Sequence, residues 1–86
     1  MLNEKTVTVG GVDYTIRELT IGQMLPLMEK LQGEDSTKAQ MEIVALSVCV
    51  DGNPIGDDAE NLGFSTYMGL SKHVMAINGM GDEGND

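Results

Sequence analysis

Residues 6–16 read TVTVGGVDYTI, and this stretch decides the beginning of the fold. Two runs in which β-branched residues alternate with other side chains are separated by two glycines, which suit the tight turn of a β-hairpin. Because an isolated hairpin is only marginally stable in water, we expect its apolar face to pack against helices. That face carries Val7, Val9, Val12, Tyr14 and Ile16, and the opposite face carries Thr6, Thr8, Asp13 and Thr15.

A first amphipathic helix is predicted directly after the hairpin. Thr20 is followed three residues later by Gln23, which is a capping-box pattern. Pro26 disturbs the pattern, because proline is tolerated in a first turn and kinks the interior of a helix. The helix therefore has either a loose first turn or a start near Leu25, and Gly33 ends it. Its apolar side chains recur at helical spacing: Ile21, Met24, Leu25, Met28 and Leu31.

A second helix is predicted from about Lys38 to Val50, after a polar segment in which Ser36 is the candidate N-cap. From Met41 onward nearly every side chain is apolar, which is typical of a buried central helix. The β-branched residues leave a strand open for the last third, Val48–Val50. Within it, Cys49 is interpreted as a core residue.

The sequence after residue 50 predicts a turn, a third helix and a tail. Residues 51–58 read DGNPIGDD and are rich in turn formers. The third helix runs from about Ser65 to Asn78 and is stopped by Asn78 and Gly79. The sequence thus predicts one small α+β domain over residues 1–79, an N-terminal β-hairpin followed by about three α-helices. Residues 80–86 lack periodicity and are expected to form a flexible, disordered acidic C-terminal tail.

Composition excludes several classes of function. The formal net charge of the 86-residue chain is −9, with 14 acidic and 5 basic residues, which disfavours binding to nucleic-acid phosphates and to anionic membranes. The longest apolar run is far shorter than the ~20 residues that span a bilayer. The N-terminus lacks the pattern of a secretory signal, so we expect a cytoplasmic protein.

With one cysteine and one histidine, neither an intrachain disulfide nor a His/Cys metal site is expected. Support for so small a core is then expected from oligomerisation or a protein partner.

No motif indicates catalysis, a cofactor or a metal. Asp35 and Ser36 resemble the phosphopantetheine site of acyl carrier proteins, but Thr37 replaces their leucine and the hairpin does not fit their all-helical fold. Asp51, Asn53 and Gly56 match the first, third and sixth positions of a calcium loop, yet Leu62 stands where its bidentate glutamate belongs. His73 is interpreted as a solvated helical residue. We therefore expect a protein that is not an enzyme.

Several stretches resemble the small tail assembly chaperones of long-tailed bacteriophages. They are an extended segment running into RELTIGQ at residues 17–23, IVALS at residues 43–47, and the third helix with its Asn-Gly stop. The resemblance covers most of residues 6–79. It implies a cytoplasmic helper in the bacterial host that binds the aggregation-prone tape measure protein during tail assembly, with the tail tube protein as a further candidate partner. Such proteins are often made in a short form and a longer, frameshifted form.

The expected contacts lie on the first and third helices. The flexible side chain of methionine suits surfaces that bind varied partners. The candidate partner-binding residues are therefore the apolar residues of these helices that are rich in methionine: Met24, Met28, Leu31, Met68 and Met75. The alternative is that these residues are simply core. The small core, which needs support, favours a homo-oligomer. Two other functions stay open: a structural virion component, such as a tail or head-completion protein, and an acidic inhibitor that mimics DNA.

Overall fold

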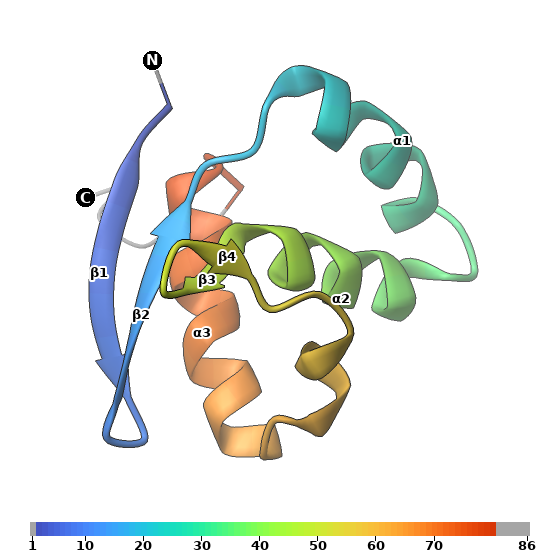
Figure 1. The fold of residues 1–86 in the computed structure, drawn as a ribbon. Coiled ribbons are helices and arrows are strands. Elements are labelled where there is room, and N and C mark those ends of the chain that lie inside the picture. Colours follow the sequence, from blue (N-terminus) through green and yellow to red (C-terminus); the bar gives the residue numbers. More distant parts are fainter. Residues whose placement is uncertain (1, 81–86) are drawn as a thin grey trace.

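The computed structural model describes residues 2–80 of the chain (Figure 1). The hairpin is followed by helices, so the predicted α+β class is confirmed. In chain order the described elements are β1 (Glu4–Val9), β2 (Val12–Arg17), α1 (Ile21–Leu31), α2 (Ser36–Ser47), β3 (Val48–Val50), β4 (Asn53–Pro54), the 3₁₀ helix η1 (Gly56–Asn61) and α3 (Phe64–Ile77).

The hairpin has the predicted two-residue turn. β1 and β2 pair in antiparallel register from Glu4 opposite Arg17 to Val9 opposite Val12. Gly10 and Gly11 have φ of 60° and 80°, a left-handed backbone that glycine adopts without a steric penalty. The apolar face is also confirmed, with Tyr14 and Ile16 buried, although Val12 at the turn is exposed.

The second helix starts two residues earlier than predicted, and the strand that was left open for its last third is confirmed. Ser36 is the first residue of α2 and not its N-cap, because Asp35 occupies that position. At the other end the helix stops at Ser47, and Val48–Val50 form β3. This strand pairs antiparallel with β2, where Cys49 lies opposite Thr15. A second hairpin follows, and the sheet order is β1-β2-β3-β4.

The first helix begins after Thr20 and includes Pro26, so a start near Leu25 is wrong. The third helix begins one residue earlier than predicted, at Phe64, and ends at Ile77. Beyond it Gly79 has φ 77°, and Met80 N–H donates to Met75 C=O at 2.8 Å, which is the pattern of a Schellman motif. Residues 81–86 of the predicted tail lie outside the described residues.

The core lies between one face of the sheet and the helices α2 and α3 (Figure 1). The other face of the β1–β2 hairpin carries Thr6, Thr8 and Asp13, which are exposed, and the half-buried Thr15. α1 lies on α2, at the end of the molecule opposite the start of α3 (Figure 1). The core is mainly aliphatic, and the residues with no exposed surface include Ile16, Ile43, Val44, Val48, Leu70 and Val74.

Candidate functional site

The five candidate contact residues do not share one environment. Met24 is buried in the core, so the interpretation of this residue as a surface contact is wrong. Its helical position faces α2 together with the buried Leu27. Leu31 and Met75 are half-buried and pack against the core. Met28 and Met68 are 44% and 49% exposed, and they remain candidate contacts.

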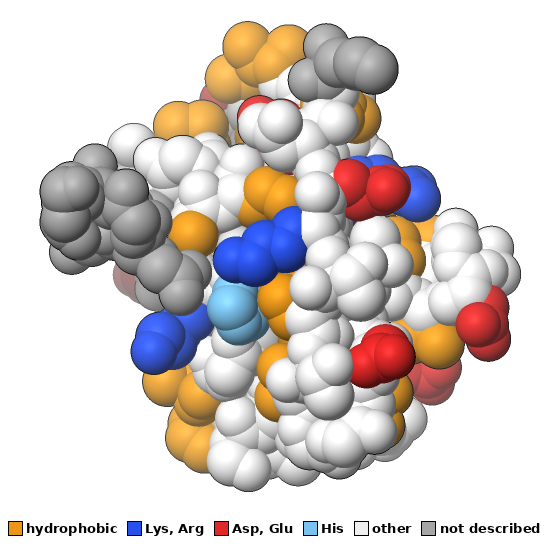
Figure 2. Space-filling model, turned by 90° about the vertical axis from the view of Figure 1, so that its left-hand side faces the viewer, with side chains coloured by type: hydrophobic (Ala, Val, Ile, Leu, Met, Phe, Trp, Pro, Cys, Tyr) orange, Lys and Arg blue, Asp and Glu red, His pale blue; other side chains and the backbone are white. Residues whose placement is uncertain are grey.

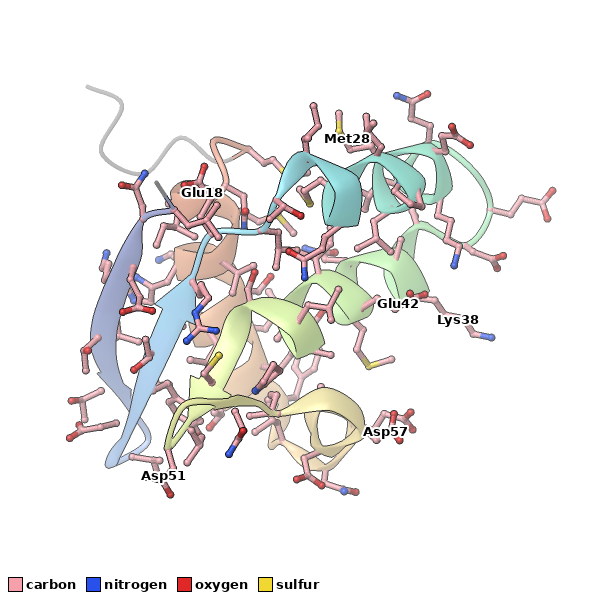
Figure 3. All side chains as sticks on the ribbon, turned by 45° about the horizontal axis from the view of Figure 1, so that its top comes forward. Glu18, Met28, Lys38, Glu42, Asp51 and Asp57 are labelled. Atoms are coloured by element: carbon pink, nitrogen blue, oxygen red, sulfur yellow. The ribbon has the colours of Figure 1, made fainter. Side chains whose placement is uncertain are left out.

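The outer face of α1 carries a stripe of exposed apolar side chains. Ile21 is 76% exposed and Leu25 is 53% exposed, and with Met28 they follow one another at steps of four and three residues. This spacing places them on one face of the helix. We call Ile21, Leu25 and Met28 the α1 stripe. Met28 projects outward from α1 in Figure 3.

The start of α1 is held by the predicted capping box. Thr20 Oγ1 accepts a hydrogen bond from Gln23 N–H at 3.2 Å, and Gln23 Oε1 accepts one from Thr20 N–H at 2.9 Å. Two of the N–H groups that a helix start leaves unpaired are thereby satisfied. Near the other end, Lys30 Nζ lies 3.4 Å from Glu42 Oε1 on α2. α1 is therefore anchored on its inner side while its outer side is open.

Asn78 connects three segments that are far apart in the sequence. Its Oδ1 accepts a hydrogen bond from the N–H of the buried Leu19 at 2.8 Å. Its Nδ2 donates to Val74 C=O at 2.9 Å and to Ser47 Oγ at 3.4 Å. The entry to α1 and the ends of α2 and α3 are thus joined by one amide. We call these contacts the Asn78 bridge.

A second exposed apolar patch lies at the start of α3. Phe64 is 76% exposed, and its ring centroid lies 6.4 Å from that of Tyr67. Burial raises the pKa of Tyr67 above its ordinary value. Phe64 and Tyr67 line an open apolar pocket of about 240 Å³ together with Met41, Ala59 and Leu62. This patch and the α1 stripe lie at opposite ends of the molecule (Figure 1).

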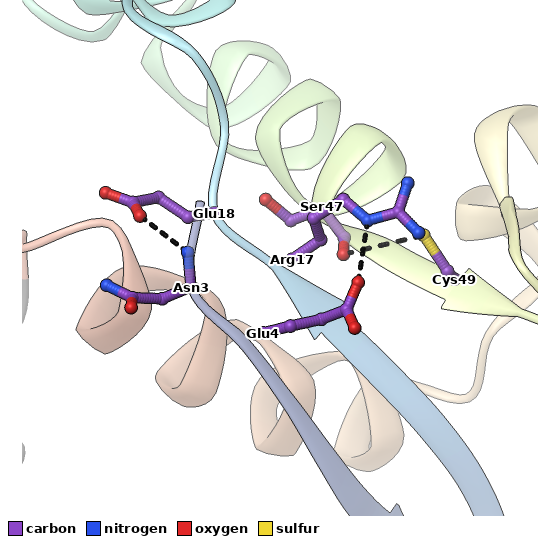
Figure 4. Close-up of polar contacts among 6 residues, drawn as sticks. All are labelled: Asn3, Glu4, Arg17, Glu18, Ser47 and Cys49. Atoms are coloured by element: carbon purple, nitrogen blue, oxygen red, sulfur yellow. Dashed lines mark hydrogen bonds and ion pairs between the residues drawn. The ribbon is translucent and has the colours of Figure 1, made fainter. Parts of the chain in front are cut away.

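The carboxylates of residues 2–80 are spread over several elements. Glu18, Asp51 and Asp57 project from different elements and in different directions (Figure 3). Two acidic side chains have local partners: Glu4 Oε2 lies 3.1 Å from Arg17 Nε, and Glu18 Oε1 accepts a hydrogen bond from Asn3 N–H at 2.9 Å (Figure 4). The regular spacing that would imitate DNA phosphates is not visible in this arrangement.

The described residues contain no group of three or more His, Cys, Asp or Glu side chains that could hold a metal ion. Cys49 is buried as predicted, and its Sγ lies 3.9 Å from Ser47 C=O (Figure 4). A thiol without solvent access is poorly placed for reaction with a substrate. Ser36, the residue compared with a carrier-protein serine, is half-buried in the first turn of α2.

Comparison with known proteins adds no assignment: no protein-family model, curated protein or solved structure matches this chain. Within residues 2–80, no helix has the length and apolar character needed to cross a membrane.

Proposed function

We propose that this chain is a tail assembly chaperone of a long-tailed bacteriophage. In this role it is not an enzyme. It acts in the cytoplasm of the bacterial host as a homo-oligomer, and it binds the tape measure protein and keeps it from aggregating. The resemblance of residues 6–79 to this family suggests the role, and the surface of α1 supports it.

The observation that carries the proposal is the α1 stripe. Ile21, Leu25 and Met28 expose about half or more of their surfaces on the outer side of one helix. Apolar residues at this spacing are what a helix presents to a second helix. Clustered exposed apolar surface on a small domain is typical of a protein interaction site. A long helical protein such as a tape measure protein offers many apolar helix faces of matching periodicity.

The charge of the chain supports the same role. A net charge of −9 repels other copies of a complex and so opposes its precipitation. The α1 stripe itself contains no ionisable side chain, although Glu29 and Lys30 follow it on the same helix. A partner helix can therefore bury the stripe without removing an unpaired charge from water, which would be costly.

The test is co-purification of this chain with the tape measure protein encoded by the same genome, using Leu25→Asp and Met28→Asp. Burying one such side chain contributes about 1.5–3 kcal/mol, so each variant should weaken the complex at least about tenfold. Because both positions are exposed, circular dichroism should report an unchanged helix content. Val12→Asp is the matched control, since Val12 is 45% exposed and lies on the hairpin, outside the α1 stripe.

Three results would contradict the proposal. Equal binding by Leu25→Asp, Met28→Asp and Val12→Asp would remove the α1 stripe from the interface. Detection of the chain in mature phage particles would instead favour a structural virion component, because a chaperone leaves before assembly is complete. Recovery of a nuclease or DNA-binding protein as the main partner would favour the acidic inhibitor.

A further inference from the structure

Within residues 2–80, no strand pairs with the outer edge of β1. In an antiparallel pair, every second residue points its N–H and C=O toward the partner strand, and the others point them away. Glu18 N–H donates to Asn3 C=O at 2.9 Å, so Asn3 belongs to the inward-pointing set. Lys5, Val7 and Val9 follow at even steps and belong to it as well. Glu4, Thr6 and Thr8 therefore direct their N–H and C=O groups outward, where β1 ends the sheet.

This edge lacks most of the features that protect edge strands from pairing. β1 contains neither proline nor glycine, and its register with β2 is continuous over six residues. Lys5 is the exception. It lies opposite the buried Ile16 and so stands on the helix side of the sheet, exposed at its rim. The positive charge of Lys5 disfavours pairing with an incoming strand whose side chain next to Lys5 is cationic or apolar.

α3 packs against the helix side of β1. A Cβ added at Gly69 would lie 3.3 Å from Val9 Cγ1, and one added at Gly10 would lie 3.3 Å from Thr66 Oγ1. Met68 is the neighbour of Gly69 in the sequence, and Lys72 lies one turn further along α3. Both are exposed, on the side of α3 away from the core residues Leu70 and Val74. Figure 2 views this side of the molecule and shows lysine or arginine side chains on either side of the histidine.

Two exposed cations, Lys5 and Lys72, lie on the helix side of β1 and on α3. Lys5 and Lys72 are two of only 5 basic residues. The acids of the hairpin, Glu4 and Asp13, stand on the opposite face of the sheet from Lys5. Glu4 pairs with Arg17, and Asp13 Oδ1 accepts a hydrogen bond from Thr8 Oγ1 at 2.6 Å. Since ionic interactions at the surface are screened beyond about 8 Å at physiological salt, the local cations matter more to a bound segment than the net charge does.

We propose that the free edge of β1 binds an extended acidic segment of another protein as a fifth strand of the sheet. The backbone of that segment pairs with Glu4, Thr6 and Thr8, as in other cases of strand addition. Its alternate side chains point toward α3, where carboxylates meet Lys5 and Lys72 and an apolar side chain meets Met68. A second copy of this chain fits less well, because a β1–β1 pair would bring two sets of these lysines to one interface.

The test is amide hydrogen exchange followed by NMR on the full chain. The probe is a short blocked peptide in which threonine alternates with glutamate and valine, and its control has lysine in place of glutamate. In the free chain the Thr6 and Thr8 amides should exchange quickly, while those of Val7 and Val9 are protected. A glutamate probe at ten times its Kd should slow exchange at Thr6 and Thr8 about tenfold, and the lysine probe should not.

Two variants separate backbone pairing from charge. Thr6→Pro removes an outward-pointing N–H without removing a β1–β2 hydrogen bond, so it should abolish probe binding, whereas Thr6→Val should retain it. Lys5→Glu should reverse the preference and favour the lysine probe, and it tests the proposal even if Thr6→Pro unfolds the chain. Because Met28 lies on α1, Met28→Asp should bind the glutamate probe normally, which separates this inference from the proposed function.

The proposal is overturned by any of three findings. The first is slow exchange at Thr6 and Thr8 in the free chain, which would mean that the edge is already occupied. The second is protection by both probes alike, which would exclude recognition by charge. The third is an absence of protection at Thr6 and Thr8 when either probe is present at saturating concentration.

Discussion

Replacing Asn78 with alanine should destabilise the domain by about 2–3 kcal/mol. The N–H of Leu19 would lose its acceptor at 2.8 Å, and Leu19 is only 6% exposed. A buried donor left unsatisfied costs about 1–3 kcal/mol. Loss of the bonds to Val74 C=O and Ser47 Oγ adds to this, and Ser47 has no exposed surface. For a domain of this size the total stability is on the order of 4–13 kcal/mol, so the loss is a substantial fraction.

The assay is urea unfolding followed by far-ultraviolet circular dichroism. With a slope of about 1 kcal/mol/M, the midpoint of Asn78→Ala should fall by about 2 M or more. Asn78→Asp keeps an acceptor for Leu19 N–H but loses the donor, so its midpoint should lie between those of the wild type and the alanine variant. Asn61→Ala, at an exposed position of η1, is the control and should shift stability by less than about 0.5 kcal/mol. If Asn78→Ala is no less stable than this control, the Asn78 bridge does not hold the three segments together.

The remaining predictions concern single sites, and thermal or urea unfolding checks each one. Thr20→Ala removes the capping box and should cost about 1 kcal/mol; an unchanged midpoint would contradict the capping role. Gly10→Ala should cost about 1–2 kcal/mol because alanine is strained at φ 60°, whereas Gly22→Ala, inside α1 with only an ordinary contact 3.9 Å from its Cβ, should stabilise by up to about 1 kcal/mol. The pKa of Tyr67 is raised by burial above its ordinary value of 10.0, so its contribution to stability is complete below that pH and is lost as pH rises through the raised pKa. Tyr67→Phe should flatten this alkaline decline, and an identical pH profile would refute it.

Local chemistry explains which parts of the fold were predictable. The β1–β2 hairpin follows from alternation and a glycine pair, and the start of α1 follows from Thr20 and Gln23, all within a few residues of one another. Val48–Val50 was left open because its apolar, β-branched residues suit either a buried helix or a strand. The pairing of Cys49 with Thr15, which is distant in the sequence, decides for the strand.

The candidate site was predictable only in part, for a related reason. α1 is apolar on more than one side, so its spacing does not reveal whether Met24 or Met28 faces the core. Packing on α2 buries Met24 and leaves Met28 exposed. Asn78 was interpreted as a helix stop, which its position confirms. Its hydrogen bond to Leu19 joins residues 59 apart in the sequence, and no local pattern indicates it.

The order of strands in the sheet has a consequence for the speed of folding. β1–β2 and β3–β4 are local hairpins, and such units form in about 1–10 μs. β2–β3 is different, because Ile16 pairs with Val48 (48 − 16 = 32 residues later) across a loop that contains α1 and α2. Closing a loop of this length costs about 3 kcal/mol of chain entropy before the pairing is gained. We therefore expect the transition state to contain the β2–β3 contact. Substitutions in β3 should then slow refolding in a stopped-flow experiment, while those on the outer side of α1 should mainly change the unfolding rate.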